Sequence, residues 1–329
     1  MKLAVVILNW NGKKLLEQFL PSVVEHSKEA TIYVADNAST DDSIAFIKIH
    51  FPSVKIIQNK VNGGYAKGYN DALKNLSEDI FCLLNNDVEV TKNWLLPIIE
   101  TFKTNPKTAI IQPKLLDYNR KDYFEYAGAA GGFIDKFGYP YCRGRIFNTI
   151  EKDTGQYNDV ADIFWASGAC LFIRNSIFNE LNGFDESFFA HMEEIDLCWR
   201  AKNQGYNVMY IGQSEVFHVG GATLSNLNPK KTYLNFRNSL YTLTKNAKGN
   251  LFVLILVRLL LDGVAGIKFL LELKFRHIIA IIHAHLNFYR NFEVLVKQRK
   301  AFKNKQKYYK KTSIVLNYYV YNFKHYKSL

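Results

Sequence analysis

Asp87 and His218 are the residues of this 329-residue chain that could bind a metal ion. Asp87 ends the sequence FCLLNND, in which an apolar run is followed by Asn85 and Asn86. A carboxylate in this position suits a hard divalent cation that takes its other ligands from water and from phosphate oxygens. His218, in VFHVGG, could add an imidazole nitrogen, and this donor pair favours Mn²⁺ over Mg²⁺. Taken alone, a histidine at such a position is more often packed or capping than a metal ligand.

Glu193 and Glu194 lie at the start of a predicted helix that runs from about Met192 to Gly205. Two interpretations are open. Carboxylates in the first turn of a helix interact favourably with its dipole as surface caps, whereas a carboxylate that faces a cleft can act as a general base.

Asn, Asp or Gly follows each of the first four apolar runs, in Asn9-Trp10-Asn11-Gly12, Asp36-Asn37, Asn59 with Gly63-Gly64, and Asn85-Asn86-Asp87. These residue types are also common turn formers, so any one of the four could be structural. A carboxylate such as Asp36 could accept hydrogen bonds from a nucleobase or ribose, and Gly63 and Gly64 could let a ligand approach the backbone closely. The sequence has neither a GxxxxGK[ST] loop nor a GxGxxG motif after its first strand, so a nucleotide would be bound in another way.

Strand and helix patterns alternate four times in the first 115 residues, with the apolar runs LAVVIL, TIYVA, VKIIQ and IFCLL before TAIIQ. This alternation predicts right-handed βαβ units and an α/β fold with a mostly parallel sheet. Ligands bind at the carboxyl edge of such a sheet, where the four polar strand ends would meet.

The second part of the chain is less regular. Residues 117–160 predict loops, short strands and an insertion that could face an acceptor, and IFWASGACLFIRN predicts a pair of strands. NVMYIG predicts one more strand, and from about residue 230 the pattern is helical.

Together, and in this order, the motifs resemble the family 2 glycosyltransferases, which are inverting nucleotide-sugar transferases of GT-A fold. The resemblance covers about residues 1–245 and is carried by VVILNWNG, VADNASTDDS, NGGYAKGYNDAL, LLNNDVEV, WASGACLFIRN, GFDESFFAHMEEIDLCWR and the HVGG that begins at His218. It is greatest to the rhamnosyltransferase-like branch, whose members build bacterial cell-surface polysaccharide. The implied halves of the catalytic domain are residues 1–115 for the nucleotide and 116–245 for the acceptor.

The resemblance also implies roles for individual residues. It places Asn9, Asn11, Asp36, Asn62, Gly63, Gly64, Asn70 and Asn86 at the nucleotide and donor, Trp165, Ser167 and Gly168 at the sugar or acceptor, Asp87 and His218 at a divalent cation, and Glu194 or Glu193 as the catalytic base. Two positions depart from the family pattern. Asn85 replaces the first carboxylate of the DxD metal motif, and Glu194 stands where the family has Asp.

The implied reaction is a single displacement in which Glu194 takes a proton from an acceptor hydroxyl as a nucleoside diphosphate departs. The donor would be a UDP- or dTDP-sugar, and the acceptor a saccharide, in particular one linked to polyprenyl diphosphate. The two departures from the family pattern leave an alternative open, namely a non-catalytic nucleotide-sugar-binding subunit that recruits partners to the membrane.

Residues 246–329 are predicted to form a helical, basic extension that associates with membranes. Arg258, Asp262, Lys268, Glu272 and Arg276 fall on one side of a helix, which leaves a broad apolar face. Such a helix suits a membrane interface or a partner, including a second copy of the chain. In the tail that follows, Phe302, Tyr308 and Tyr309 are expected to enter the interface beside many lysines.

The net charge of +12 comes entirely from this extension, because residues 273–329 hold 13 basic and one acidic side chain. A basic segment on a neutral body suggests contact with a polyanion, and an anionic membrane is preferred over nucleic acid because no nucleic-acid-binding fold is evident. Four scattered cysteines, with no CxxC pair, exclude a disulfide scaffold and give no indication of a structural zinc site. We therefore expect a cytoplasmic protein, peripheral on the inner face of the cell membrane.

Overall fold

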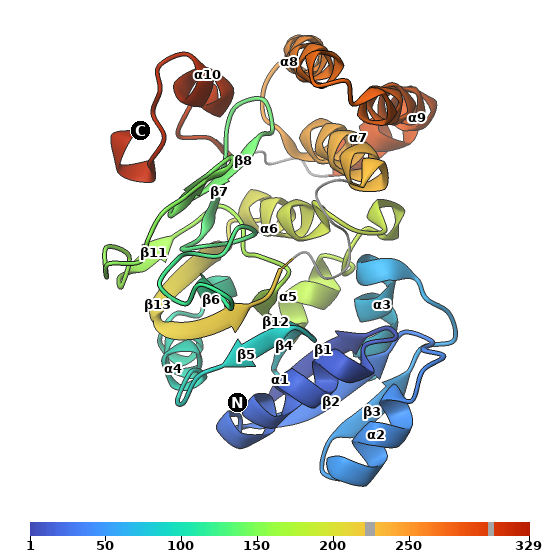
Figure 1. The fold of residues 1–329 in the computed structure, drawn as a ribbon, viewed down its shortest axis with the longest axis vertical. Helices are drawn as coiled ribbons and strands as arrows, with labels where there is room; N and C mark the ends of the chain where they lie inside the picture. The colour runs from blue at the N-terminus through green and yellow to red at the C-terminus, as the bar shows by residue number, and fades with distance from the viewer. Residues whose placement is uncertain (221–227, 302–305) are drawn as a thin grey trace.

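The computed structural model of the chain describes residues 1–220, 228–301 and 306–329. A central sheet has the strand order β11-β13-β6-β12-β4-β1-β2-β3, and β5 pairs with β13 (Figure 1). Its strands are β1 (Leu3–Asn9), β2 (Ala30–Asp36), β3 (Lys55–Gln58), β4 (Ile80–Asn85), β5 (Val88–Val90), β6 (Thr108–Asp117), β11 (Val160–Asp162), β12 (Cys170–Arg174) and β13 (Asn207–His218).

The N-terminal strands β1 to β4 pair in parallel, as the sequence predicts. β6 and β13 are also parallel, whereas β12 runs antiparallel between β4 and β6. Side chains along β1 alternate between two hydrophobic cores, with Val5 and Ile7 in one and Ala4 and Val6 in the other. Both faces of the sheet are therefore buried, which explains the unbroken apolar runs.

Helices cover both faces of the sheet (Figure 1). α1 (Lys13–His26), α2 (Ser43–His50) and α4 (Leu96–Thr104) bury apolar residues in one core, and α3 (Gly64–Leu73), α5 (Asn175–Glu180), α6 (Glu193–Asn203) and α7 (Pro229–Asn246) bury theirs in the other. A smaller antiparallel sheet, β10-β9-β8-β7, consists of β7 (Gly132–Ile134), β8 (Pro140–Cys142), β9 (Arg145–Ile146) and β10 (Thr149–Ile150).

The predicted strand pair at IFWASGACLFIRN is wrong in its first half. Only β12 is a strand, and the preceding residues are irregular apart from one bridge between Trp165 and Gly132. The indole of Trp165 packs so closely on Gly132 that a Cβ there would lie 2.0 Å from the ring. Individual long-range contacts, such as this one and the hydrogen bond from Ile163 N to Val208 O, hold the segment in place of a strand ladder.

The C-terminal helices are α8 (Leu251–Leu271), α9 (Phe275–Ala301) and α10 (Ile314–Tyr319), and short 3₁₀ turns occur at η1 (Glu186–Phe188) and η2 (Tyr326–Ser328). Arg258 and Asp262 of α8 are buried, with Nε of Arg258 2.7 Å from Asp262 Oδ1. The hydroxyl of Tyr139, just before β8, donates to the same Asp262 oxygen. This part of the charged side of α8 therefore faces the turn between β7 and β8, and apolar side chains face outward.

The tail after α9 packs on α6 and on the smaller sheet, which corrects one expectation. Tyr308 is buried against Trp199 and its hydroxyl donates to Lys136 O, so it does not enter a membrane interface. Tyr326 stacks on Phe133. Phe302 lies outside the described residues. Among the helices that the structure describes, none combines the length and apolarity that crossing a bilayer requires.

Candidate functional site

Asp87 and His218 meet because β5, which follows Asp87, pairs with the end of β13. Oδ1 of Asp87 lies 3.1 Å from Nε2 of His218, and both side chains are buried. The amide nitrogen of Asn85 is 3.3 Å from the same imidazole nitrogen. The structure thus brings together the two predicted metal ligands.

Glu125 is a third member of this cluster, and sequence reasoning missed it. Its Oε1 lies 3.3 Å from His218 Nδ1, and its side chain is buried. Glu125 sits in the irregular 117–160 segment, where no periodicity marks it. The only signal was an acidic residue within the aromatic sequence YFEYAG.

The chemistry of these donors fits a divalent cation. A carboxylate and an imidazole suit Mn²⁺, and the remaining ligands can come from phosphate oxygens and water. Within the described part of the chain, no cluster of three or more His, Cys, Asp and Glu side chains has the arrangement of a complete metal site. Burial lowers the pKa of His218, but the charges of Glu125 and Asp87 outweigh this effect. The net result raises the pKa from its ordinary value of 6.5 to about 10. A cation would therefore have to displace a proton from the imidazole.

Asn9, Asp36 and Asn86 form an amide and carboxylate network at the ends of three adjacent strands, in which Asn9 and Asp36 are buried and Asn86 is partly exposed. Asn86 Nδ2 donates to Asn9 Oδ1 at 2.9 Å, and Asn9 Nδ2 lies 3.5 Å from Asp36 Oδ1. Asn11, at a φ of 49°, holds the neighbouring loop because its Oδ1 accepts from Thr40 N. Convergence of these side chains follows from the parallel register of β2, β1 and β4.

Asn62, Gly63 and Gly64 form the start of α3. Asn62 Oδ1 accepts from Gly64 N at 3.0 Å. Gly64 has a φ of 74°, and a Cβ on it would lie 2.5 Å from the carbonyl oxygen of Phe189. The close backbone approach that Gly64 permits is thus to the segment before α6.

Asn70 contacts protein backbone with both ends of its amide. Its Nδ2 donates to Phe184 O, and its Oδ1 accepts from Phe184 N. These two hydrogen bonds fix the chain ahead of α6, and the expected place of Asn70 near the ribose and diphosphate stays a prediction.

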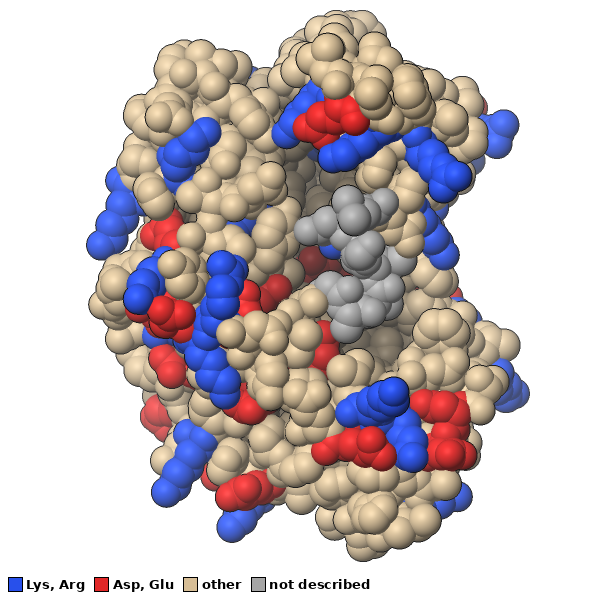
Figure 2. Space-filling view, in the orientation of Figure 1, with Lys and Arg blue, Asp and Glu red and all other residues tan. Residues whose placement is uncertain are grey.

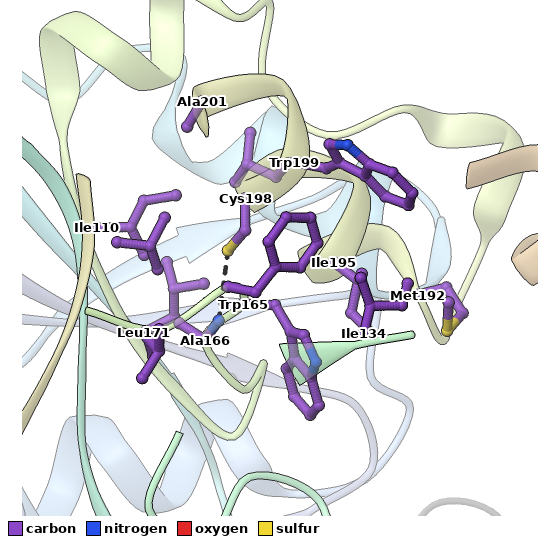
Figure 3. Close-up of a cluster of buried hydrophobic side chains, with 14 of the residues drawn as sticks. Ile110, Ile134, Trp165, Ala166, Leu171, Met192, Ile195, Cys198, Trp199 and Ala201 are labelled. Carbon is purple, nitrogen blue, oxygen red and sulfur yellow. Dashed lines mark hydrogen bonds between the residues drawn. The ribbon is translucent and has the colours of Figure 1, made fainter. Parts of the chain in front are cut away.

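Trp165 and Ser167, expected to face sugar or acceptor, are instead buried. Trp165 lies among the apolar side chains of Ile134, Met192 and Ile195, and its Nε1 donates to Phe133 O (Figure 3). Ser167 is 1% exposed and its hydroxyl accepts from Ala169 N. The apolar neighbours of the Trp165 indole come from distant segments of the chain, so local sequence could not show its burial.

Gly168 is connected to the predicted base through Tyr65. Its carbonyl accepts a hydrogen bond from the hydroxyl of Tyr65 in α3. Burial is the largest cause that raises the pKa of Tyr65, and the charges of Glu193 and Glu194 raise it as well. Tyr65 therefore connects Gly168 to the carboxylates at the start of α6.

Glu193 and Glu194 are in the first turn of α6, as predicted, but they are not surface caps. Glu193 is 4% exposed, Glu194 is half-buried, and Oε2 of each is buried without a hydrogen-bond partner. Burial raises the pKa of Glu194 to about 7, although N–H groups of the first turn oppose the shift. Burial and the charge of Glu194 raise the pKa of Glu193. Such a pair is poised to hold or accept a proton near neutral pH.

The backbone just before this pair is strained. Phe189 has φ 64° and ψ −59°, and Ala190 N donates to Phe188 O, which closes a rare three-residue γ-turn. His191 and Met192 also have positive φ values, of 70° and 72°. Each such residue costs about 1–3 kcal/mol, and this strain is found mainly at functional sites.

The metal-ligand cluster and the base segment act electrostatically on the same side chains. The charges of both Glu125 and Glu194 act on Cys142, and Lys231 interacts electrostatically with Glu125 and with His191. Burial and Lys231 lower the pKa of His191 to about 4. Figure 2 shows one face of the molecule hollowed across its middle, with acidic side chains along the hollow.

A sheet of this topology, with its amide and carboxylate edge, has the GT-A fold of nucleotide-sugar transferases. The solved structure described as GalNAc-T7 with UDP, GalNAc and Mn²⁺ is similar, with a TM-score of 0.59 and 17% identity over 75% of this chain and 48% of that one. The match thus covers about half of that larger protein. Residues 4–181, more than half of the chain, match the family described as glycosyl transferase family 2. The chain belongs to this family and is a glycosyltransferase.

Curated relatives include rhamnosyltransferases. The N-acetylglucosaminyl-diphospho-decaprenol L-rhamnosyltransferase of Mycobacterium tuberculosis (strain CDC 1551 / Oshkosh) is 26% identical over 66% of this chain and 75% of its own length. The rhamnosyltransferase WbbL of Escherichia coli K12 is 27% identical over 63% of this chain and 77% of its own length.

Proposed function

We propose that this chain is an inverting glycosyltransferase that moves a sugar from a UDP- or dTDP-sugar to a lipid-linked saccharide in the synthesis of bacterial cell-surface polysaccharide. The observation that carries the proposal is the buried Glu193–Glu194 pair, in which Oε2 of each side chain has no hydrogen-bond partner, in a chain that also brings Asp87 to within 3.1 Å of His218. The named activities of the curated relatives support a sugar donor and a saccharide acceptor.

Glu194 acts as the base in this proposal. It takes the proton of an acceptor hydroxyl while that oxygen bonds to the anomeric carbon and the bond to the nucleoside diphosphate breaks. Attack opposite the leaving group inverts the anomeric configuration. Glu193 stays protonated beside it because two adjacent buried carboxylates do not readily ionise together.

Asp87 and His218 would hold the divalent cation, Mn²⁺ or Mg²⁺. When bound, it supplies charge neutralisation for the departing diphosphate. Glu125, 3.3 Å from Nδ1, orients the imidazole of His218, and the Asn9–Asp36–Asn86 network lines the nucleoside position.

The proposal is tested by stability measurements with nucleoside diphosphates, with and without Mn²⁺, on the natural chain and on Asp87→Ala. A ligand at a hundred times its dissociation constant adds about 2.7 kcal/mol to the free energy of unfolding. One diphosphate should stabilise the natural chain only with metal and should have no effect on Asp87→Ala. Binding without sugar transfer in a following assay would favour the non-catalytic alternative.

We further propose that residues 246–329 attach the enzyme to the cytoplasmic face of the membrane. Large apolar side chains recur at helical spacing on the outer side of α8, at Phe252, Leu256, Leu260, Val264, Ile267 and Leu271, and on α9, at Phe275, Ile279, Ile282, Leu286 and Tyr289. We call these residues the α8–α9 apolar face. So many exposed large apolar side chains on two helices in contact are unusual on a protein without a partner.

The neighbouring charges favour an anionic lipid surface as that partner. Lys268, Lys274 and Arg276 are exposed at the turn between α8 and α9, and Arg290 is exposed further along α9. Glu272 and Glu293 are the exposed acids in the same stretch. Amphipathic helices with basic flanks bind membrane interfaces through apolar burial and attraction to anionic headgroups.

Vesicle binding tests this attachment. The chain should sediment with phosphatidylglycerol vesicles more than with phosphatidylcholine vesicles, and the double variant Leu260→Ser, Ile267→Ser should lose at least about tenfold in affinity, since each buried side chain contributes about 1.5–3 kcal/mol. Ile49→Ser, which removes an equally exposed apolar residue on α2, is the control. If the double variant instead abolishes a dimer and leaves vesicle binding intact, the face pairs with a second copy of the chain.

A further inference from the structure

A single side chain, Asn238 of α7, contacts most of the strained turn that precedes the catalytic helix. Asn238 is 0% exposed. Its Nδ2 donates to the carbonyl oxygens of Phe188 at 3.1 Å, Ala190 at 2.9 Å and His191 at 2.7 Å. These carbonyls belong to the γ-turn and to the positive-φ residue that follows it.

Arg237 fixes the orientation of the Asn238 amide. Nε of Arg237 donates to Asn238 Oδ1 at 2.8 Å, which leaves the Asn238 nitrogen to face the turn. Nη2 of Arg237 itself donates to Ser187 O and Phe188 O. On the opposite side, Tyr65 N of α3 donates to Phe189 O. Hydrogen bonds from α7 and α3 thus hold the turn from two sides.

α7 also holds α6 just after the carboxylate pair. Asn246 Nδ2 donates to Asp196 Oδ1 at 2.8 Å, and Lys245 Nζ lies 3.0 Å from the same oxygen. Glu193 and Glu194 therefore sit between two attachments to one helix. Residues 188–192 adopt a backbone that is unfavourable in isolation, so their conformation depends on these attachments.

We propose that Asn238 is a positioning residue that holds the 188–192 turn in its strained conformation and thereby sets the position of Glu193 and Glu194. The proposal rests on the proposed function of that pair. Asn238 itself makes no contact with either carboxylate. Asn238 therefore sets the catalytic geometry only through the backbone of residues 188–192.

The expected consequence of losing Asn238 is a defect in the chemical step. When the turn relaxes, the carboxylates move and gain solvent, so kcat falls while binding of the donor nucleotide changes little. The groups that face the pair are Tyr65 from α3, Cys142 from β8 and Cys198 from α6, with His191 and Lys231 beside the turn. None of these is altered by the substitution, so a shift in the pH profile would report a change in solvation of the pair.

The experiment compares Asn238→Ala and Asn238→Asp with the natural chain and with Asn203→Ala. Asn203 is a matched control, because it is a buried asparagine that donates to a backbone carbonyl, Asn246 O, at the far end of α6. We expect both Asn238 variants to lose at least tenfold in kcat, to keep the KM for the donor within about threefold, and to show the rise of kcat with pH displaced toward lower pH. Asn203→Ala should lose stability without a displaced pH profile.

Arg237→Gln provides a second variant if the Asn238 variants do not fold. It keeps Asn238 but removes the Arg237 contacts to the turn, and we expect a smaller fall in kcat with the same displacement. An unchanged kcat and pH profile in every folded variant would overturn the proposal. Glu193→Gln and Glu194→Gln, measured in parallel, distinguish failure of the positioning role from failure of the proposed function. If a glutamate variant abolishes transfer but the α7 variants do not, only the positioning role fails, and if neither glutamate matters, the proposed function fails with it.

Discussion

At the scale of a single residue, two opposing effects set the pKa of Glu194. Burial favours the protonated form, whereas the N–H groups of the first turn of α6 favour the carboxylate. The balance leaves its pKa near 7, where a base is both available and strong enough to take a proton. An unperturbed glutamate would be ionised at this pH but would be a weaker base.

Transfer should therefore depend on the ionisation of this pair. We expect kcat to rise with pH through about 7, because the carboxylate is the active form. Glu194→Gln should lower kcat by about 10²–10⁴-fold and remove this rise. A pH series of initial rates with the natural chain and with Glu193→Gln and Glu194→Gln decides which residue is the base. A pH profile that survives both substitutions would assign the base elsewhere.

The same raised pKa makes the pair costly to the fold. The pKa of Glu194 is raised from its ordinary value of 4.5 to about 7 in the folded state. Its proton therefore stabilises the fold fully below pH 4.5, and this stabilisation is lost as the pH rises through about 7. Glu194→Gln should thus stabilise the protein at pH 8 by on the order of 2 kcal/mol and change little at pH 4. Urea unfolding at the two pH values measures the difference, and equal effects at both would contradict it.

Glu125 gives a further prediction at this scale. A carboxylate that orients a metal-binding histidine typically contributes 10- to 100-fold to metal affinity. Glu125→Gln should raise the Mn²⁺ concentration that gives half-maximal transfer by about that factor. Glu89→Gln, on β5 near the same edge but paired with Lys121, is the control and should have little effect. Isothermal titration of Mn²⁺ gives a second readout without turnover.

At the scale of the elements, the first half of the fold could be predicted from sequence because its signals are local. Apolar runs buried on both faces, followed by Asn or Asp, specify β1 to β4 and their polar edge. The residues that shape the second half act through distant contacts. Trp165 depends on Gly132, and Asn70 on Phe184, so neither position could be deduced from its neighbours.

Gly64 shows how one element positions another. Gly64→Ala would combine an unfavourable φ with a contact of 2.5 Å to Phe189 O, whereas Gly205→Ala shares the positive φ but has no atom within 4 Å. The φ penalty is about 1–2 kcal/mol in each variant. We expect Gly64→Ala to lose more free energy of unfolding than Gly205→Ala and, in addition, to lower kcat by displacing the turn before α6. Equal stability and full activity would show that the contact is easily relieved.

At the scale of the whole molecule, charge and apolar surface have separate locations. The N-terminal 272 residues are neutral overall, and the excess positive charge follows residue 272. Part of that basic segment returns to the catalytic domain, where Tyr308 and Tyr326 pack, and α8 turns Arg258 and Asp262 inward. The apolar side chains of α8 and α9 are thereby presented outward by a buried polar network.

This arrangement predicts that the apolar face affects transfer only when the acceptor is in a membrane. Attachment of the enzyme and the acceptor to one surface raises their effective concentration without changing the catalytic residues. Leu260→Ser combined with Ile267→Ser should therefore reduce transfer to a polyprenyl-linked acceptor in phosphatidylglycerol vesicles by at least about tenfold, through lost membrane binding. The same variant should be fully active on a short-chain, water-soluble acceptor, and Ile49→Ser should be normal in both assays. Equal losses with both acceptors would mean that the α8–α9 apolar face supports the catalytic domain rather than its attachment to the membrane.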